Sequence, residues 1–212
     1  MAKIKDVTKS NKSKPHLLHP FGSDDEVEAG VDEVGRGCGA GPVVAAAVIL
    51  PPVVDLPDVR DSKKLSAEKR NSMSLLIQEV ALDFAIGVAT VEEIDDINIL
   101  EATYLAMNRA IQGLKKKPTL LIIDGNRYKN TSNIRYQTVI GGDDKVLSIA
   151  AASILAKTWR DDYMAQLHDQ HPQYDWKNNK GYLTAKHRNA CFLHGLTKHH
   201  RHTFGGMRPA GE

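Results

Sequence analysis

The chain has 212 residues, of which 42% are hydrophobic and 25% charged, and its formal net charge is +2. These values predict one globular domain with a sizeable core, and because no run of 18 apolar residues occurs, we expect no membrane span. The two cysteines, Cys38 and Cys191, provide neither a disulfide framework nor a metal-binding spacing, which predicts a reducing, cytoplasmic location.

Residues 1–26 are expected to form a flexible basic tail in front of a domain that spans residues 27–212. The first 20 residues carry five lysines against one acid and lack the apolar segment of a secretory signal. A solvated, disordered tail is the simpler interpretation, and a weak electrostatic contact with nucleic acid is the alternative.

The hydrophobic pattern predicts an α/β fold in which a mixed five-stranded sheet is flanked by helices. The expected strands are 27–35, 43–50, 82–90, 118–126 and a strand that begins at 135; the expected helices are 67–80, 92–114, 145–169 and about 184–194. Ser66 stands where it can cap the first helix. Residues 170–183 read as a polar loop, and the part from about 165 to 212 is expected to be a helical C-terminal segment.

Acidic residues stand at the ends of apolar strands three times, each time beside glycine: Asp32-Glu33, Asp124 and Asp143-Asp144. A dry, unpaired carboxylate costs several kcal/mol, and no matching set of arginines lies nearby in the sequence. Mg²⁺ or Mn²⁺ would compensate these charges, and two such ions about 4 Å apart are used in phosphoryl chemistry. The alternative is that each acid caps a helix or lies in a turn, which explains one occurrence better than three.

Asp32 and Glu33 are adjacent, so in a regular strand their side chains point to opposite faces of the sheet. We therefore expect a twist or bulge near Gly35, or metal ligation at the edge of the sheet. The turn Gly35-Arg36-Gly37 exposes backbone without large side chains, so it can approach a sugar or phosphate closely.

These motifs together resemble type 2 ribonuclease H (RNase HII). The matching segments lie between about residues 29 and 204 and read AGVDEVGRG, DSKKLS, LLIIDGN, GGDD before AAASILAK, NKGYLT and HGLTKHHRHTF. Type 3 enzymes match less well, because they have a GTG-like turn and an extra N-terminal domain that the 28 preceding residues cannot supply. The resemblance implies an RNase H-like sheet with a helical C-terminal part.

The resemblance also implies an activity. A type 2 enzyme cleaves RNA in RNA–DNA hybrids and cuts 5′ of single ribonucleotides embedded in duplex DNA, with two divalent ions, Mg²⁺ or Mn²⁺. The products carry 3′-hydroxyl and 5′-phosphate ends, and the roles are ribonucleotide removal in DNA repair and primer RNA degradation in replication. The implied partners are these nucleic acids, and we expect a monomer that needs no membrane.

Carried over motif by motif, the family's four catalytic and metal-binding acids correspond to Asp32, Glu33, Asp124 and Asp143. Asp143 is preferred to Asp144 because of its position relative to AAASI, although the family commonly has Lys-Gly-Asp there. The family's ribose-reading tyrosine corresponds to Tyr182, in a GYLT motif whose Leu183 replaces the usual proline. The backbone of Gly35, Arg36 and Gly37 is implied to contact the 2′-hydroxyl.

Four further residues are candidates for phosphate contacts: Lys63, Lys64, Ser153 and Lys157. The alternative for each lysine is a solvated surface charge. His199, His200 and His202 are not expected to bind zinc, because they lack cysteine partners and an HExxH motif. With Arg201 they are expected to pack the C-terminus or to touch a DNA backbone.

Two other functions keep the same fold. A metal-dependent DNA nuclease or resolvase would cut an all-DNA duplex as well as one with a ribonucleotide. A non-catalytic hybrid-binding module would bind without metal and show no turnover, which four retained acids argue against. Dependence on an accessory subunit is possible, but no feature of the sequence demands it.

Overall fold

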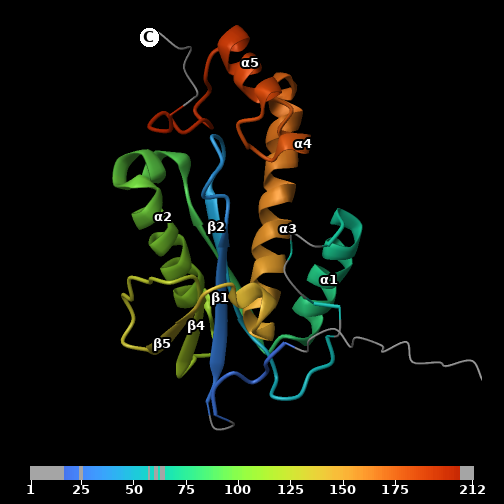
Figure 1. Cartoon of the computed structure of the whole chain (residues 1–212), viewed down its shortest axis with the longest axis vertical. Coiled ribbons are helices and arrows are strands. Elements are labelled where there is room, and N and C mark those ends of the chain that lie inside the picture. Colours follow the sequence, from blue (N-terminus) through green and yellow to red (C-terminus); the bar gives the residue numbers. More distant parts are fainter. Residues whose placement is uncertain (1–16, 24–25, 57, 60–61, 63–64, 206–212) are drawn as a thin grey trace, which may run out of the picture.

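Five strands form one mixed sheet with helices on both faces (Figure 1). The computed structural model describes residues 17–23, 26–56, 58–59, 62 and 65–205. The strands are β1 (Glu28–Val34), β2 (Val43–Ile49), β3 (Asp83–Ala89), β4 (Leu120–Asp124) and β5 (Arg135–Val139), in the spatial order β3-β2-β1-β4-β5. β2 pairs antiparallel with β1 and β3, whereas β4 pairs parallel with β1 and β5. The predicted mixed five-stranded sheet is confirmed.

The helices are α1 (Ala67–Val80), α2 (Val91–Gly113), α3 (Leu147–Gln170), α4 (Trp176–Asn179) and α5 (Ala185–His194), with 3₁₀ turns η2 (Gly142–Asp144) and η3 (Pro172–Tyr174). In Figure 1, α2 lies on one side of the sheet, α3 and α1 lie on the other, and α4 and α5 gather at the far end of α3. The predicted loop at 170–183 is wrong in part, because η3 and α4 are too short to leave a helical period in the sequence. Within the described residues, no helix has the length and hydropathy to cross a membrane.

Local side chains set where the helices begin and bend. The Ser66 hydroxyl accepts a hydrogen bond from the Lys69 N–H at 3.2 Å, which confirms the predicted cap. α2 is not continuous as predicted, because Asn98 adopts a left-handed φ of 69° inside it. The Asn98 side chain then accepts bonds from the N–H groups of Leu100 and Glu101 and so caps the second part of the helix.

Small residues let the helices lie directly on the sheet. A Cβ built on Gly87 of β3 would lie 2.1 Å from the carbonyl oxygen of Ala106 and 2.4 Å from the amide nitrogen of Ala110, both in α2. On β1, a Cβ at Gly30 would lie 2.2 Å from the backbone carbon of Ser148 in α3. Both helices therefore pack with their backbones against the strands, which leaves no room for side chains at these glycines.

Residues 17–23 pack against the domain, although the sequence analysis assigned them to the flexible tail. Leu18 N–H donates to the Lys145 carbonyl at 2.8 Å, and Leu147 N–H donates to the Leu18 carbonyl at 3.1 Å. Phe21 N–H donates to the Glu28 carboxylate at 2.6 Å. The packed chain therefore includes this segment, while residues 1–16 lie outside the part that the structure describes.

Histidine and aromatic rings form a buried, hydrogen-bonded cluster in the C-terminal part of the chain. Trp176 Nε1 donates to His187 Nε2 at 3.0 Å, and His187 Nδ1 donates to the Tyr182 carbonyl at 3.0 Å. Thr197 N–H donates to His200 Nδ1 at 2.9 Å. Burial lowers the pKa of both histidines, and that of His200 falls to about 3. Both rings are therefore neutral at pH 7 and act as fixed hydrogen-bonding groups.

Replacing Gly87 by alanine should destabilise the protein by about 1–3 kcal/mol, because the new methyl group must push α2 away from β3. Urea denaturation measures this change, with Gly205→Ala as the control, since nothing lies within 4 Å of a Cβ at Gly205. The control should stay within about 0.5 kcal/mol of the wild type. Equal stability of Gly87→Ala and the control would contradict the close helix–sheet contact.

Acid should destabilise the fold through His200. The unfolded chain takes up a proton near the ordinary histidine pKa of 6.5, whereas folded His200 does so only near pH 3. The unfolded state therefore binds more protons between these values, so the free energy of unfolding falls as pH falls, by about 1 kcal/mol per pH unit between pH 6 and 5. Denaturation of His200→Gln should show a shallower pH slope than that of the wild type. Identical slopes for the two proteins would argue against a buried neutral His200.

Candidate active site

Asp32 and Asp124 lie side by side where two parallel strands end. The pairing of β1 with β4 stops at Val31 and Ile123, and the two aspartates are the next residue of each strand. Along each strand side chains alternate, so both aspartates lie on the face that carries α3. Ligands in open α/β sheets bind outside the carboxyl ends of the strands, and these two acids occupy that position.

The turn η2 brings a third acid to this edge. Gly142 N–H donates to Asp124 Oδ1 at 2.7 Å, which ties the turn to the end of β4. Asp143, the next residue, is only 8% exposed, whereas the following Asp144 is exposed. The burial of Asp143 next to Gly142 favours it over Asp144 as the family's acid.

The acids repel one another, and burial strengthens the effect of this repulsion on their pKa values. Burial raises the pKa of Asp32 well above its usual range, and the charges of Glu33 and Asp124 raise it further. Burial also raises the pKa of Glu33. The charge of Arg36 lowers this pKa, and the charge of Asp124 raises it. Hydrogen bonds from the Ser153 hydroxyl and from Glu33 N–H, the latter at 2.7 Å, partly stabilise the charged form of Asp32.

No bulge separates Asp32 from Glu33. The β1–β2 register runs without interruption from Gly30 opposite Val48 to Val34 opposite Val44, so the two acids point to opposite faces. The second expectation, ligation at the edge where β1 leaves β4, agrees better with this ladder. On its own face Glu33 accepts a long hydrogen bond of 3.5 Å from Arg36, whose side chain is half-exposed.

This donor set fits divalent cations. Its oxygen ligands are the kind that Mg²⁺ and Mn²⁺ prefer. Among the described residues, no lysine or arginine forms an ion pair with Asp32 or Asp124. Burial and, after it, the neighbouring carboxylates raise the pKa of Asp32, and a cation among these groups would favour its charged form.

In the Gly35–Gly37 turn, Arg36 and Gly37 are exposed and Gly35 is buried, and a buried arginine bonds the turn from the inner side. Cys38 N–H donates to the Gly35 carbonyl at 3.4 Å, and Gly35 has a φ of +95°, which favours glycine. Arg201 donates to the carbonyls of Gly35 at 2.7 Å and Arg36 at 2.9 Å. The sequence predicted that Arg201 packs the C-terminus or touches a DNA backbone, but it gave no signal that this fully buried residue supports a turn 166 positions away.

Tyr182 stands beside the same turn. Gly39 N–H donates to the Gly181 carbonyl at 2.9 Å, which joins the two loops. A Cβ at Gly37 would lie 3.9 Å from Tyr182 Cε1, and the tyrosine side chain is 48% exposed. Leu183, in place of the family's proline, packs over Gly39, where a Cβ would lie 2.6 Å from its Cγ.

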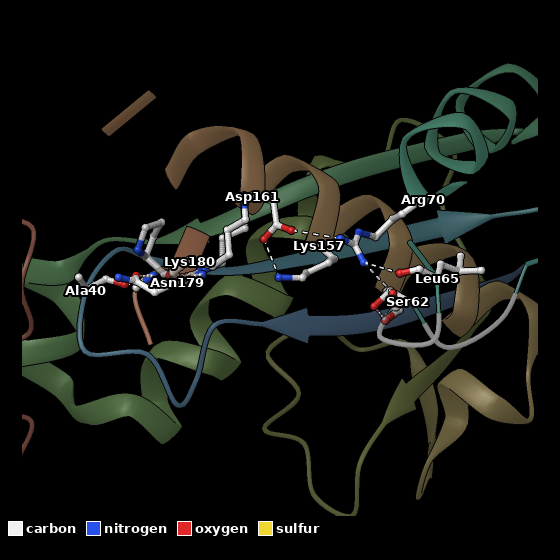
Figure 2. A network of polar contacts seen from close by, with 12 residues as sticks. Ala40, Ser62, Leu65, Arg70, Lys157, Asp161, Asn179 and Lys180 are labelled. Carbon is white, nitrogen blue, oxygen red and sulfur yellow. Dashed lines mark hydrogen bonds and ion pairs between the residues drawn. The ribbon is translucent and has the colours of Figure 1, made fainter. Parts of the chain in front are cut away.

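A polar network links α3 to the segment before α1, and Figure 2 shows it from close by. Arg70 donates to the Ser62 carbonyl at 2.8 Å and to Asp161 at 3.4 Å, and Lys157 donates to Asp161 at 2.6 Å. Lys157 thus has an acidic partner, and its predicted phosphate contact stays a prediction. Lys63 and Lys64 lie outside the described residues.

Ser153 is buried, with 5% of its surface exposed, and its hydroxyl lies 3.0 Å from that of Ser62. It also donates to Asp32. This placement favours a role in orienting Asp32 over the predicted contact with a phosphate. The sequence contains no signal for that role, because Ser153 and its hydrogen-bonding neighbour Ser62 are 91 residues apart along the chain.

One group of nitrogen and sulfur ligands does gather among the described residues: His187, Cys191 and His200, with ligand atoms within 4.8 Å of one another. It differs from the histidine run considered above. Thr197 N–H requires a lone pair on His200 Nδ1, so the ring proton is on Nε2, where a metal would have to bind. The Trp176 N–H meanwhile occupies the lone pair of His187 Nε2. The group is therefore a hydrogen-bonded cluster rather than a metal site.

The fold is that of solved type 2 and type 3 enzymes. The ribonuclease H2 of Pyrococcus horikoshii OT3 superposes with a TM-score of 0.69, covering 85% of this chain and 94% of its own, at 22% identity. Bst-RNase HIII, solved in complex with Mn²⁺, superposes with a TM-score of 0.64 over 85% of this chain and 67% of its own, also at 22% identity.

Sequence comparison is more specific. The Ribonuclease HII of Phocaeicola vulgatus is 54% identical over 190 residues, which cover 89% of this chain and 94% of that protein. The Ribonuclease HII of Porphyromonas gingivalis is 48% identical over 191 residues, covering 90% and 95% of the two chains. The sequence model of the Ribonuclease HII family matches residues 29–206, which include Asp32, Glu33, Asp124 and Asp143. The chain belongs to the ribonuclease HII family and is a ribonuclease H type 2 endonuclease.

Proposed function

We propose that this enzyme cleaves RNA in RNA–DNA hybrids and also cuts 5′ of single ribonucleotides embedded in duplex DNA, leaving 3′-hydroxyl and 5′-phosphate ends. The observation that carries this proposal is the position of Tyr182 against Gly37. A contact surface formed by an aromatic ring and bare backbone therefore begins at Gly35, three residues after Asp32 and two after Glu33.

The turn and Tyr182 would select the sugar. RNA differs from DNA at each nucleotide by the 2′-hydroxyl, which donates and accepts hydrogen bonds. Within Gly35, Arg36 and Gly37, the exposed N–H groups of Arg36 and Gly37 would reach such a hydroxyl, because the glycines on both sides of Arg36 have no side chain. The half-exposed Tyr182 ring would pack against the same sugar and limit the positions that the nucleotide can take.

The four acids Asp32, Glu33, Asp124 and Asp143 would hold two divalent ions, Mg²⁺ or Mn²⁺. Bound there, such ions supply an activated water molecule and neutralise charge on the phosphate. The chain's own contribution is orientation: Ser153 donates to Asp32, Gly142 N–H fixes Asp124, and Arg36 limits the movement of Glu33. No side-chain nucleophile is required in this proposal.

The remaining expectations concern the cell. The substrates proposed here fit roles in ribonucleotide removal and in primer RNA degradation. We propose a monomer located in the cytoplasm, where the free thiols of buried Cys38 and Cys191 would stay reduced. Lys157, and Lys63 and Lys64 beyond the described residues, are proposed to contact backbone phosphates without reading sequence.

Asp124→Asn should lower metal-dependent cleavage by at least about 100-fold, because a metal ligand and several kcal/mol of charge stabilisation are lost. Thermal denaturation should show a folded protein, since the amide oxygen can still accept from Gly142 N–H. Asp143→Asn should likewise lose cleavage and stay folded. Asp144→Asn, at the exposed neighbouring residue, is the matched control and should keep its activity. Full activity in Asp124→Asn, or equal loss in the Asp143 and Asp144 variants, would refute the assignment of these acids.

Tyr182→Ala should reduce cleavage of a duplex with one ribonucleotide by about 10-fold or more, because loss of an aromatic contact with the sugar removes about 1–3 kcal/mol. Cleavage rates of three duplexes test this: all-DNA, the same sequence with one ribonucleotide, and a long hybrid. The exposed Phe192→Ala is the control, since it is a surface aromatic on α5. Equal cutting of the all-DNA and single-ribonucleotide duplexes by the wild type would instead indicate a DNA nuclease.

A further inference from the structure

Two buried arginines lie behind the loop that follows β1. Arg160 and Arg201 both have 0% of their surface exposed, and neither forms an ion pair with a carboxylate among the described residues. Each guanidinium donates instead to main-chain carbonyls between residues 35 and 42, and Arg160 also donates to Lys180. A buried cation is tolerated only when its N–H groups are bonded, so these arginines and the loop specify each other's positions.

Arg201 holds two consecutive peptide groups of the turn. Its Nη2 donates to the Gly35 carbonyl at 2.7 Å and its Nη1 donates to the Arg36 carbonyl at 2.9 Å. Its Nε donates to the Gly41 carbonyl at 2.9 Å, which closes the loop on the same guanidinium. The oxygens of both turn peptides therefore point inward, toward one planar group.

The direction of these carbonyls fixes the direction of two amides. In a trans peptide the C=O and N–H groups point in opposite directions, and His19–Pro20 is the one cis bond among the described residues. The N–H groups of Arg36 and Gly37 consequently point away from Arg201. Both residues are exposed, and within the described part of the chain neither N–H has a hydrogen-bond partner.

We propose that Arg201 is a positioning residue for ribose recognition: it turns the Arg36 and Gly37 amides outward as a pair of donors beside Tyr182, aimed at the 2′-hydroxyl oxygen of the substrate. This inference rests on the proposed function, and it adds the residue that orients the sugar-reading backbone. A lysine cannot replace Arg201. Its single ammonium group lacks the planar guanidinium that donates to the carbonyls of Gly35, Arg36 and Gly41 at the same time.

Arg160 offers a matched comparison. It is equally buried, and it donates to Ala40 at 2.9 Å, Pro42 at 2.9 Å and Lys180 at 2.8 Å, so it stabilises the same loop without bonding either turn carbonyl. In Figure 2, Ala40 and Lys180 lie at one end of the polar network, and Arg70 and Ser62 lie at the other end. Arg160→Lys should therefore destabilise the fold to a similar extent while leaving the carbonyls of Gly35 and Arg36 on Arg201.

The test measures the affinity for a duplex with one ribonucleotide relative to the all-DNA duplex, in an Asp124→Asn background that binds without cutting. Arg201→Lys should lower this affinity ratio by about fivefold or more, since two hydrogen bonds to the hydroxyl are misdirected. Arg160→Lys should keep the ratio within about twofold of the parent. Thermal denaturation of each variant sets a temperature at which all of them are folded.

Three outcomes are informative. An unchanged ratio in folded Arg201→Lys, or an equal fall in both arginine variants, would overturn the positioning role. A parent protein that binds both duplexes equally would reject the proposed sugar recognition itself, which is a different result. A fall of the affinity ratio in Arg201→Lys, without a fall in Arg160→Lys, supports the inference.

A measurement without arginine substitution covers the case in which Arg201→Lys does not fold. In ¹⁵N-labelled Asp124→Asn protein, the amide resonances of Arg36 and Gly37 should shift on addition of the single-ribonucleotide duplex and much less with the all-DNA duplex. Equal shifts with both duplexes would show that these amides do not read the 2′-hydroxyl, and the proposal would be wrong.

Discussion

Mutual repulsion of buried carboxylates is the constraint on which the site depends. Asp32, with 5% of its surface exposed, lies on β1 where the pairing with β4 stops, beside Glu33 on the same strand and Asp124 on the next. Burial and both neighbouring charges raise its pKa, so the metal-free fold holds this group in an environment that disfavours its charged form. Such an arrangement lowers stability, and cations bound among the carboxylates would offset the repulsion.

The sequence predicted the sheet and the main helices and drew attention to the acids, because each leaves a local signal. Strands and long helices have a hydrophobic period, and an acid that ends an apolar strand is conspicuous beside glycine. Even the preference for Asp143 over Asp144 agrees with their burial. The kink at Asn98 and the short turns at 172–179 were missed, since a single left-handed residue or one helical turn has no period to detect.

What the sequence could not predict was which distant side chains support the site. Ser62 and Ser153 meet 91 residues apart, and Arg201 reaches Gly35 across 166 positions. Neither contact follows from composition or spacing, because tertiary packing alone sets it. The histidines illustrate the same limit: the sequence drew attention to the run at 199–202, whereas the structure joins His200 to His187 and Cys191.

The turn that would read the sugar directly follows β1, the strand that carries Asp32 and Glu33. Glu33 and Gly35 are separated only by Val34, and β1 is fixed on both sides by β2 and β4. A phosphate and its own ribose are likewise separated by a few bonds, so a sugar held at the turn also sets the phosphate relative to Asp32. Small displacements of a reacting group reduce rates strongly. Buried arginines behind the turn and buried carboxylates before it would therefore meet one requirement of the proposed function: a fixed distance between the ribose that is recognised and the bond that is cut.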